Sequence, residues 1–123
     1  ARTPFHQWLL PELIAVSDEE NSVTIRLMIR PELGNSIERT DLHGGVVAAL
    51  IDIAGHAAVA AKVRHSVPTI DMRVDYLRPA SGTEILATAS IVKFGRTISL
   101  VDIRLNDDQK RVVAVGRASY VTS

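Results

Sequence analysis

One long apolar segment near the middle of the chain constrains the fold more than any other feature. Residues 43–63 begin with His-Gly-Gly and continue almost entirely with apolar side chains, interrupted by Asp52 and His56. Alanine and straight-chain residues dominate the segment and favour an α-helix. A helix that is apolar on every side is normally buried, and this one has too many interruptions and too much alanine for a membrane span. We therefore expect a buried central helix that carries one carboxylate.

Strand patterns lie on both sides of this helix. Residues 22–30 alternate between apolar and polar side chains, which predicts a half-buried strand. Four more segments with strand character follow the helix and are separated by turns at residues 79–82, Gly95 and residues 106–110. These four expected strands are residues 69–78, 83–94, 96–105 and 111–122, and Gly116 in the last of them predicts a β-bulge.

The amino-terminal part of the chain is expected to be less regular. Residues 4–14 have apolar side chains at near-helical spacing and predict a short helix that begins at Pro4 and is limited by Pro11. Residues 17–21 predict a polar turn, and residues 32–42 predict a loop.

The order of these elements predicts the fold class. Consecutive strands joined by short turns pair antiparallel, and one long apolar helix must cover the apolar face of the sheet. A chain of 123 residues has room for one core. We therefore expect residues 1–123 to form a single α+β domain whose antiparallel sheet is wrapped around the central helix. Because the helix is apolar all round and strand edges need covering, we also expect a homodimer with two-fold symmetry.

Composition argues against several classes of partner and site. Lys plus Arg and Asp plus Glu are equal at 14 each, so no bulk field favours nucleic acid or an anionic membrane. The chain has no cysteine, no metal-ligand spacing, no P-loop and no dinucleotide-binding glycine pattern. We therefore expect no cofactor and no metal. The first residues lack the pattern of a signal peptide, which predicts a cytoplasmic protein.

Two groups of residues resemble a known enzyme family. The first is His43-Gly44-Gly45 with Asp52 nine positions after the histidine, all in one helix. The second is the next strand, residues 69–80 (TIDMRVDYLRPA), together with the Gly-Arg-Thr turn at residues 95–97. With this combination the chain, from about residue 22 to residue 122, resembles the hotdog-fold acyl-CoA thioesterases, and among them the PaaI-like, phenylacetate-pathway type.

The resemblance implies an activity and a set of catalytic residues. It implies hydrolysis of a medium-chain or aromatic acyl-CoA to the free acid and CoA, with Asp52 as nucleophile or general base. The backbone N–H of Gly44 would polarise the thioester carbonyl, where the helix dipole also favours negative charge. His43 is expected to orient or brace this loop. The family places its site between subunits, so Asp52 is expected to face Thr69 of the neighbouring protomer, and the homodimers often assemble into homotetramers.

The resemblance also implies where the substrate binds. Gly45 is expected beside the carbonyl site. Arg96 and Thr97 lie in the turn near which the family binds the nucleotide and pantetheine of CoA, and Arg78 is a further candidate. An arginine suits phosphate because its guanidinium is a rigid donor fork.

One position departs from the family pattern. Relatives have Asn or Gln six residues before the histidine, and that position here is Ile37. Either the loop is two residues longer and Asn35 takes the role of positioning substrate or water, or the role is lost.

Other interpretations of the same residues stay open. Asp52 also fits a structural acid bonded to His56 one helical turn later, and the two glycines also fit an ordinary turn. The whole domain also fits a non-catalytic hotdog protein that binds acyl-CoA as a sensor or carrier-protein partner. A hotdog dehydratase or hydratase fits less well, because those enzymes use a histidine base in a different local pattern.

Overall fold

The central helix is present at the predicted position. The computed structural model describes residues 3–123, apart from the side chains of residues 39 and 40, and α2 spans Gly44–Val63. His43 caps its amino end, and its Nδ1 accepts the N–H of Gly45 at 2.8 Å. Arg64 ends it in the left-handed conformation (φ 65°), and its N–H bonds to the carbonyl of Ala60. The helix therefore begins and ends through local capping that the sequence itself supplies.

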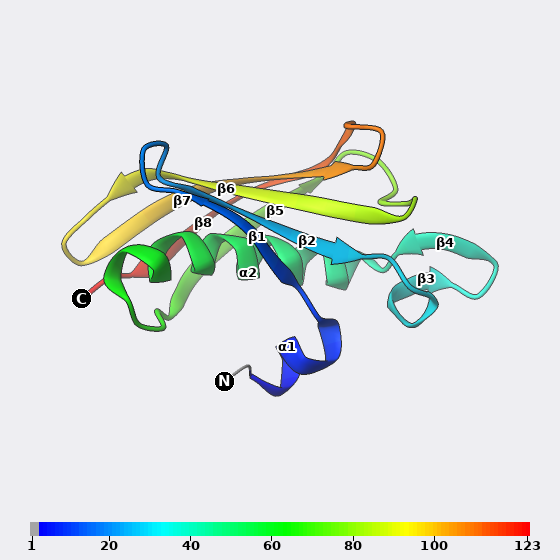
Figure 1. Ribbon diagram of the computed structural model, residues 1–123, viewed down its shortest axis with the longest axis horizontal. Helices are drawn as coiled ribbons and strands as arrows, with labels where there is room; N and C mark the ends of the chain where they lie inside the picture. The colour runs from blue at the N-terminus through cyan, green and yellow to red at the C-terminus, as the bar shows by residue number, and fades with distance from the viewer. Residues whose placement is uncertain (1–2) are drawn as a thin grey trace.

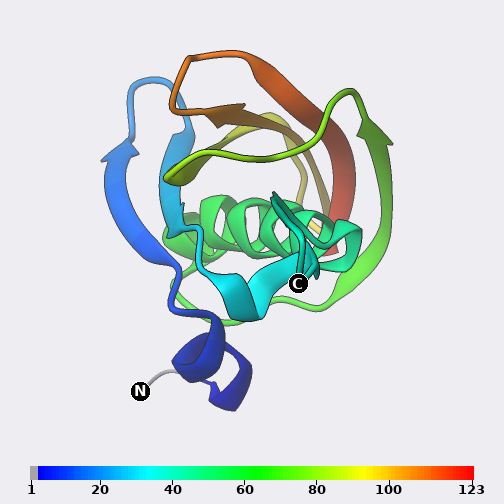
Figure 2. The ribbon, with the colours of Figure 1, turned by 90° about the vertical axis from the view of Figure 1, so that its right-hand side faces the viewer.

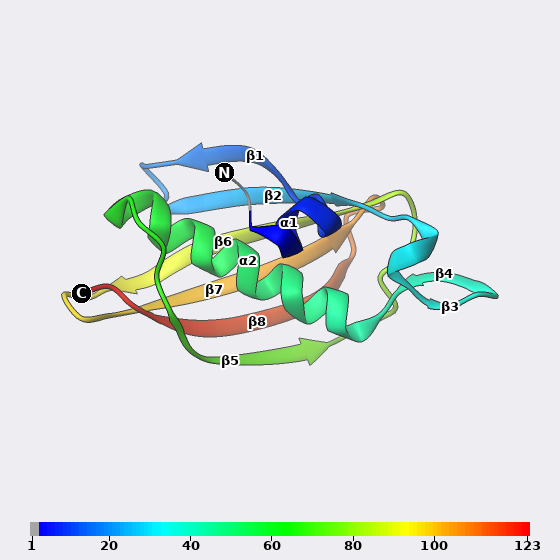
Figure 3. The same ribbon diagram turned by 90° about the horizontal axis from the view of Figure 1, so that it is seen from below.

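Six strands form one antiparallel sheet that curls around α2. Their order is β1-β2-β6-β7-β8-β5. Figure 3 shows α2 lying across the inner face of this sheet, and Figure 2 shows the sheet curving around the helix. The prediction of an α+β hotdog fold is confirmed. The strands are β1 (Glu12–Ser17), β2 (Ser22–Met28), β5 (Thr69–Tyr76), β6 (Glu84–Phe94), β7 (Ile98–Asp107) and β8 (Val112–Val121).

The core lies between α2 and the inner face of the sheet. Alternate side chains of the inner strands point toward the helix and are buried, as a period of two requires. The helix has the length and hydropathy of a membrane span, but here it forms the core of the domain on one side. Its other side, which includes Asp52 and His56, is only half-buried within a single chain. The residues that α2 buries are Val47, Leu50, Ile51, Ala54, Gly55, Ala58 and Val59.

The amino-terminal helix begins at Pro4 and ends before Pro11, as expected. α1 spans only Pro4–Leu9, because Leu10 takes the left-handed conformation with φ 62°. The strand β1 that follows, at residues 12–17, pairs with β2 and was not predicted. The apolar residues there lie on an edge strand, where their spacing imitates a helical pattern. The guanidinium of Arg30 donates to the carbonyls of Trp8 and Leu9 and fixes the end of α1.

The segment before α2 is more regular than the expected loop. It contains the 3-10 turn η1 (Pro31–Leu33) and a small hairpin of β3 (Gly34–Ser36) and β4 (Arg39–Leu42). Figure 1 shows this hairpin beyond the amino-terminal end of α2. The strands are too short for alternation to reveal them.

The expectation that consecutive strands pair is wrong for β5 and β6. β5 does not pair with β6, although only residues 77–83 separate them. It pairs with β8 at the edge of the sheet, while β6 pairs with β2. The long helix carries the chain across the sheet before β5 begins. The expectation that strands joined by a short turn pair with each other does not take that crossing into account.

Gly116 and the last turn also differ from expectation. The register of β8 is unbroken at Gly116, which pairs with Ile103 and Val74, so the predicted bulge is wrong. A Cβ at this position would lie 2.6 Å from Cγ2 of Ile51 on α2. The glycine therefore permits close approach of the helix to the sheet. β7 also continues to Asp107, inside the predicted loop.

Candidate functional site

The carboxylate of Asp52 is held from one side by two hydroxyl groups. Thr69 Oγ1 donates to its Oδ1 at 2.9 Å, and Tyr120 Oη donates to the same oxygen at 3.0 Å. Among the groups that the structure describes, no donor reaches Oδ2. Asp52 is half-buried, on the side of α2 that the sheet does not cover. One oxygen is thus anchored and the other is available for chemistry.

Thr69 reaches Asp52 within its own chain. This hydroxyl was expected from the neighbouring protomer, but β5 runs beside α2 and brings residue 69 to the aspartate directly. Thr69 is exposed in the single chain. Within the single chain it is therefore a hydrogen-bond partner of the carboxylate.

Tyr120 is the contact that the sequence analysis missed. It is fully buried in β8, and its hydroxyl also lies 3.1 Å from the carbonyl oxygen of Asp52. Burial, followed by the charge of Asp52 and the hydrogen bond to it, raises the pKa of Tyr120, so the hydroxyl remains a donor. Only the register of the last strand against α2 brings residue 120 to residue 52, and no local pattern contains that information.

His56 bonds to the chain after α2 rather than to Asp52. Its Nε2 accepts the N–H of Val67 at 3.2 Å and lies 3.1 Å from Ser66 Oγ. Burial lowers the pKa of His56, the charge of Asp52 opposes that shift, and His6 adds to it. The structural Asp52–His56 hydrogen bond considered above is therefore not formed in the described residues. The histidine fixes the connection between α2 and β5.

The amino end of α2 offers one unused backbone donor. Gly45 gives its N–H to His43 Nδ1, while the N–H of Gly44 has no acceptor among residues 3–123. Tyr76 Oη donates to the Gly44 carbonyl at 2.8 Å and holds this first residue in place. A free N–H at a helix amino end is suited to a negative oxygen. Gly45 is committed to the cap, and His43 is an exposed capping residue.

Strand β5 contacts both the carboxylate of Asp52 and the amino end of α2, each from one of its two ends. Thr69, its first residue, bonds to Asp52, and Tyr76, its last, bonds to Gly44. Gly44 and Asp52 are eight residues apart on one continuous helix, which is about 12 Å along its axis. Within one chain the free N–H and the carboxylate are thus too far apart for direct attack on a carbonyl held by that N–H.

The remaining predicted residues lie in three different places. Arg78 follows β5 closely and is exposed near the Tyr76 end of the strand. Arg96 and Thr97 are exposed in the β6–β7 turn, which Figure 1 shows near the carboxyl end of α2. Asn35 is exposed on β3 and makes no side-chain hydrogen bond within the described chain. The structure of one chain does not bring these residues together.

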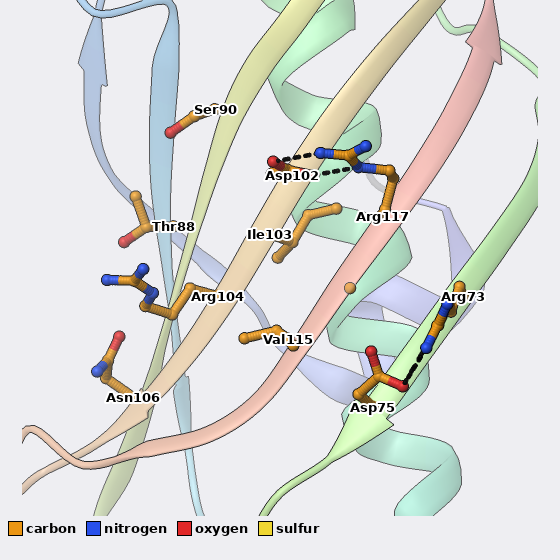
Figure 4. Close-up of a pocket in the computed structure, with 11 residues that line it drawn as sticks. Arg73, Asp75, Thr88, Ser90, Asp102, Ile103, Arg104, Asn106, Val115 and Arg117 are labelled. Carbon is orange, nitrogen blue, oxygen red and sulfur yellow. Dashed lines mark hydrogen bonds and ion pairs between the residues drawn. The ribbon is translucent and has the colours of Figure 1, made fainter.

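A hollow of about 740 Å³ lies elsewhere, on the outer face of the sheet. Figure 4 shows its polar side chains on β5, β6, β7 and β8. Asp102 is paired with Arg117 at 2.6 Å and Asp75 with Arg73 at 3.4 Å. The hydrogen bond from Arg117 lowers the pKa of Asp102. Because these carboxylates are already neutralised and lie across the sheet from α2, the Asp52 region is the better candidate site.

No metal site accompanies either region in residues 3–123. No group of three His, Cys, Asp or Glu side chains there lies close enough to hold an ion. The chemistry available at Asp52 is that of a carboxylate, two hydroxyls and a helix amino end.

The chain belongs to the thioesterase superfamily, whose family model matches residues 40–114. An E. coli K12 protein named medium/long-chain acyl-CoA thioesterase YigI is 29% identical over 133 residues, covering 96% of this chain and 84% of that protein. A Halobacterium salinarum protein whose name includes the word esterase is 42% identical over 90 residues. That match covers 65% of this chain and 59% of the other, so it spans less than two thirds of that relative.

Solved structures agree with this assignment. A crystal structure of a thioesterase-superfamily protein has a TM-score of 0.90 at 37% identity, covering 98% of this chain and 89% of that one. The E. coli PaaI protein of the phenylacetic acid degradation operon has a TM-score of 0.86 at 21% identity, over 98% of this chain and 84% of that one. The latter identity supports the fold alone. The expectation of a hotdog enzyme of the thioesterase class is confirmed, and the likeness to the E. coli PaaI protein confirms the fold.

Proposed function

We propose that this protein is an acyl-CoA thioesterase that hydrolyses a medium-chain or aromatic acyl-CoA to the free acid and CoA. The observation that carries the proposal is the pairing of a carboxylate with one free oxygen and a helix amino end with one free N–H. The names of the relatives support the acyl-CoA substrate, since YigI is named for medium and long acyl chains. No cofactor is required by this chemistry.

The active site of the proposed enzyme is shared between two copies of the chain. β5 is an edge strand whose Thr69 end lies at Asp52 and whose Tyr76 end lies at Gly44. If two β5 strands pair antiparallel about a two-fold axis near their centres, each Thr69 end meets the partner's Tyr76 end. Asp52 then faces Gly44 of the partner subunit, and two equivalent sites form. Further assembly of such dimers gives the expected homotetramer.

Each group has a defined task in the proposed reaction. The partner subunit's Gly44 donates its N–H to the thioester oxygen and stabilises the negative charge that develops there, an effect of about 3–4 kcal/mol for one donor in other oxyanion holes. Asp52 Oδ2 either attacks the carbonyl carbon, forming a mixed anhydride that water then hydrolyses, or removes a proton from a water molecule that attacks the same carbon. In both routes the carbon–sulfur bond breaks, and the CoA thiolate leaves and takes up the proton that the water gives up. Arg78 and Arg96 are the proposed contacts for CoA phosphates.

The proposal is tested first by Asp52→Asn in a panel of acyl-CoA substrates. This change keeps the size of the side chain and removes its charge, so we expect kcat to fall roughly 10²- to 10⁴-fold while the protein remains folded. Unchanged turnover by the folded variant rules out the mechanism. If the wild-type protein binds acyl-CoA without multiple turnover, the non-catalytic binding function is supported instead.

A second experiment asks whether the site is shared. Gly44→Pro removes the free N–H, and the first helical position tolerates proline because His43 already has the extended conformation that proline requires before it (ψ 139°). Gly44→Ala keeps the N–H, and its Cβ would meet Tyr76 at an ordinary 3.6 Å. We expect Gly44→Pro to lose about 10²- to 10³-fold in kcat and Gly44→Ala to stay active.

The decisive sample is a mixed dimer of Asp52→Asn and Gly44→Pro chains, purified with two different affinity tags. A shared site predicts one intact site and one doubly damaged site, hence half the wild-type activity per dimer. Sites contained within single chains predict no activity in the mixed dimer. The second result overturns the shared arrangement and leaves the assignment of Asp52 unaffected.

A further inference from the structure

Tyr120 is a fully buried tyrosine whose hydroxyl points at the proposed catalytic carboxylate. Its Oη lies 3.0 Å from Oδ1 of Asp52 and 3.1 Å from the carbonyl oxygen of the same residue. A tyrosine hydroxyl has one hydrogen to donate, and both of its acceptors here belong to residue 52. The contact thus couples the side chain of Asp52 to the backbone of α2, and it does so from the rigid interior of the sheet.

Gly55 provides the space for this hydroxyl on α2. A Cβ at position 55 would lie 2.3 Å from Tyr120 Oη and 3.0 Å from Cζ, distances that side chains do not tolerate. Gly55 is helical and buried, a position where glycine is less favourable than alanine. A glycine at this position, inside an alanine-rich helix, is explained by the need to admit the tyrosine.

Thr69 and Tyr120 approach the same oxygen from different elements. Thr69 is exposed on an edge strand, whereas Tyr120 is buried on the inner strand β8. Both donate to Oδ1 and neither reaches Oδ2. A carboxylate with one oxygen bonded twice cannot rotate freely about its Cβ–Cγ bond. The other oxygen is therefore kept in one direction.

We infer that Tyr120 is a positioning residue for the hydrolysis reaction, and that with Gly55 it fixes the orientation of Asp52 so that Oδ2 faces the thioester carbon. This inference rests on the proposed function for its chemistry. The inference goes beyond the proposed function because it assigns a role to a buried hydroxyl that does not itself touch substrate. The chemical requirement it meets is orientation, which contributes to rate when the reacting atoms are held in a near-attack geometry.

Tyr120→Phe removes the hydroxyl and keeps the ring. We expect kcat on the best acyl-CoA substrate to fall roughly tenfold or more, as for loss of one hydrogen bond to a charged group. KM, and the Kd for a non-hydrolysable thioether analogue of the substrate, should stay unchanged, because binding groups are untouched. The matched control is Thr122→Val, which deletes another buried hydroxyl, bonded to the Gly95 carbonyl at 2.8 Å. It should retain wild-type kcat.

Two further measurements do not depend on turnover. A crystal structure of Tyr120→Phe should show the Asp52 carboxylate in more than one orientation, against one in the wild type. Gly55→Ala should lower Tm less in the Tyr120→Phe background than in the wild type, because the atom nearest to the new methyl group is then absent.

The possible outcomes separate this inference from the proposed function. Wild-type kcat in Tyr120→Phe, together with an inactive Asp52→Asn, overturns the positioning role and leaves the thioesterase standing. If the wild-type protein shows no turnover, the proposed function fails, and a single carboxylate orientation in the Tyr120→Phe crystal structure then overturns the positioning role as well. A fall in both kcat and Tm that Thr122→Val reproduces also overturns it.

Discussion

His56 makes the stability of the domain depend on pH in the mildly acidic range. Burial lowers its pKa in the folded chain below the ordinary value of 6.5, and its Nε2 accepts the N–H of Val67. The unfolded chain therefore binds a proton more readily than the folded chain as pH falls below 6.5. Folding stability is highest above this pH and decreases as pH falls through the window beneath it.

This prediction is checked by measuring the free energy of unfolding with urea at pH 7.5 and pH 5.0. We expect the free energy of unfolding of the wild type to be lower at pH 5.0 than at pH 7.5. For His56→Gln we expect a smaller decrease in this free energy between the two pH values, because glutamine does not titrate. Equal pH dependence in the wild type and His56→Gln contradicts the assignment to His56.

The residues of the candidate site differ in how far sequence alone could predict them. Asp52, His43 and Gly44 were found because they belong to one continuous helical pattern, where spacing alone fixes which residues share an element. Thr69 was found by position, but its chain was misassigned, because a single sequence does not say how β5 lies along α2. Tyr120 was missed because its contact spans 68 residues and depends on strand register.

Gly116 shows at the level of elements how closely α2 packs on the sheet. A Cβ there would lie 2.6 Å from Ile51 Cγ2 and 3.0 Å from the Arg73 carbonyl oxygen. We expect Gly116→Ala to lower the free energy of unfolding by about 1–3 kcal/mol, because the helix must move away. Ile51→Leu, which removes the Cγ2 branch, should restore part of that loss when combined with it. Urea unfolding of the two single variants and the double variant measures the coupling.

The coupling also distinguishes close packing from the β-bulge expected from sequence. A bulge glycine is needed for its backbone conformation, so its replacement would cost the same whatever residue 51 is. Strictly additive effects of Gly116→Ala and Ile51→Leu would therefore contradict the packing explanation. The sequence could not distinguish close packing from a β-bulge at Gly116. Close packing depends on the distance between α2 and the sheet, whereas the sequence pattern reports only the alternation within one strand.

Alternation and helix composition were sufficient to predict most elements but not their neighbours. β2, β6, β7 and β8 were recognised because each has a buried inner face that imposes a period of two. β1 was not, because as an exposed edge strand it buries little, and its apolar residues follow no clean alternation. The position of β5 beside β8 depends on how α2 crosses the sheet, which is a property of the packed domain.

The whole molecule leaves apolar side chains exposed on both edge strands of the sheet, β1 and β5, and on β1 they are Leu13, Ile14 and Val16. The inward-facing residues of β5 remain accessible in the single chain, with Ile70 at 48%, Met72 at 38% and Tyr76 at 56% exposure. The side of α2 next to them is only half-buried. Apolar side chains on an unpaired edge strand are unfavourable in water and favour association with a second copy. The β5 edge carries Thr69 and Tyr76, which contact the two halves of the proposed site.

A charge at the centre of β5 should therefore separate the subunits and abolish turnover together. We expect Met72→Asp to elute as a monomer of about the chain mass of 13.4 kDa in size-exclusion chromatography with light scattering. Its kcat should fall roughly 10²-fold or more, since each Asp52 loses the partner subunit's Gly44 N–H. Ile14→Asp, on the opposite edge strand β1 and 46% exposed, is the matched control and should stay dimeric and active. A monomeric Met72→Asp variant with full activity would mean that one chain holds the complete site, whereas a dimeric variant would place the subunit contact on another surface.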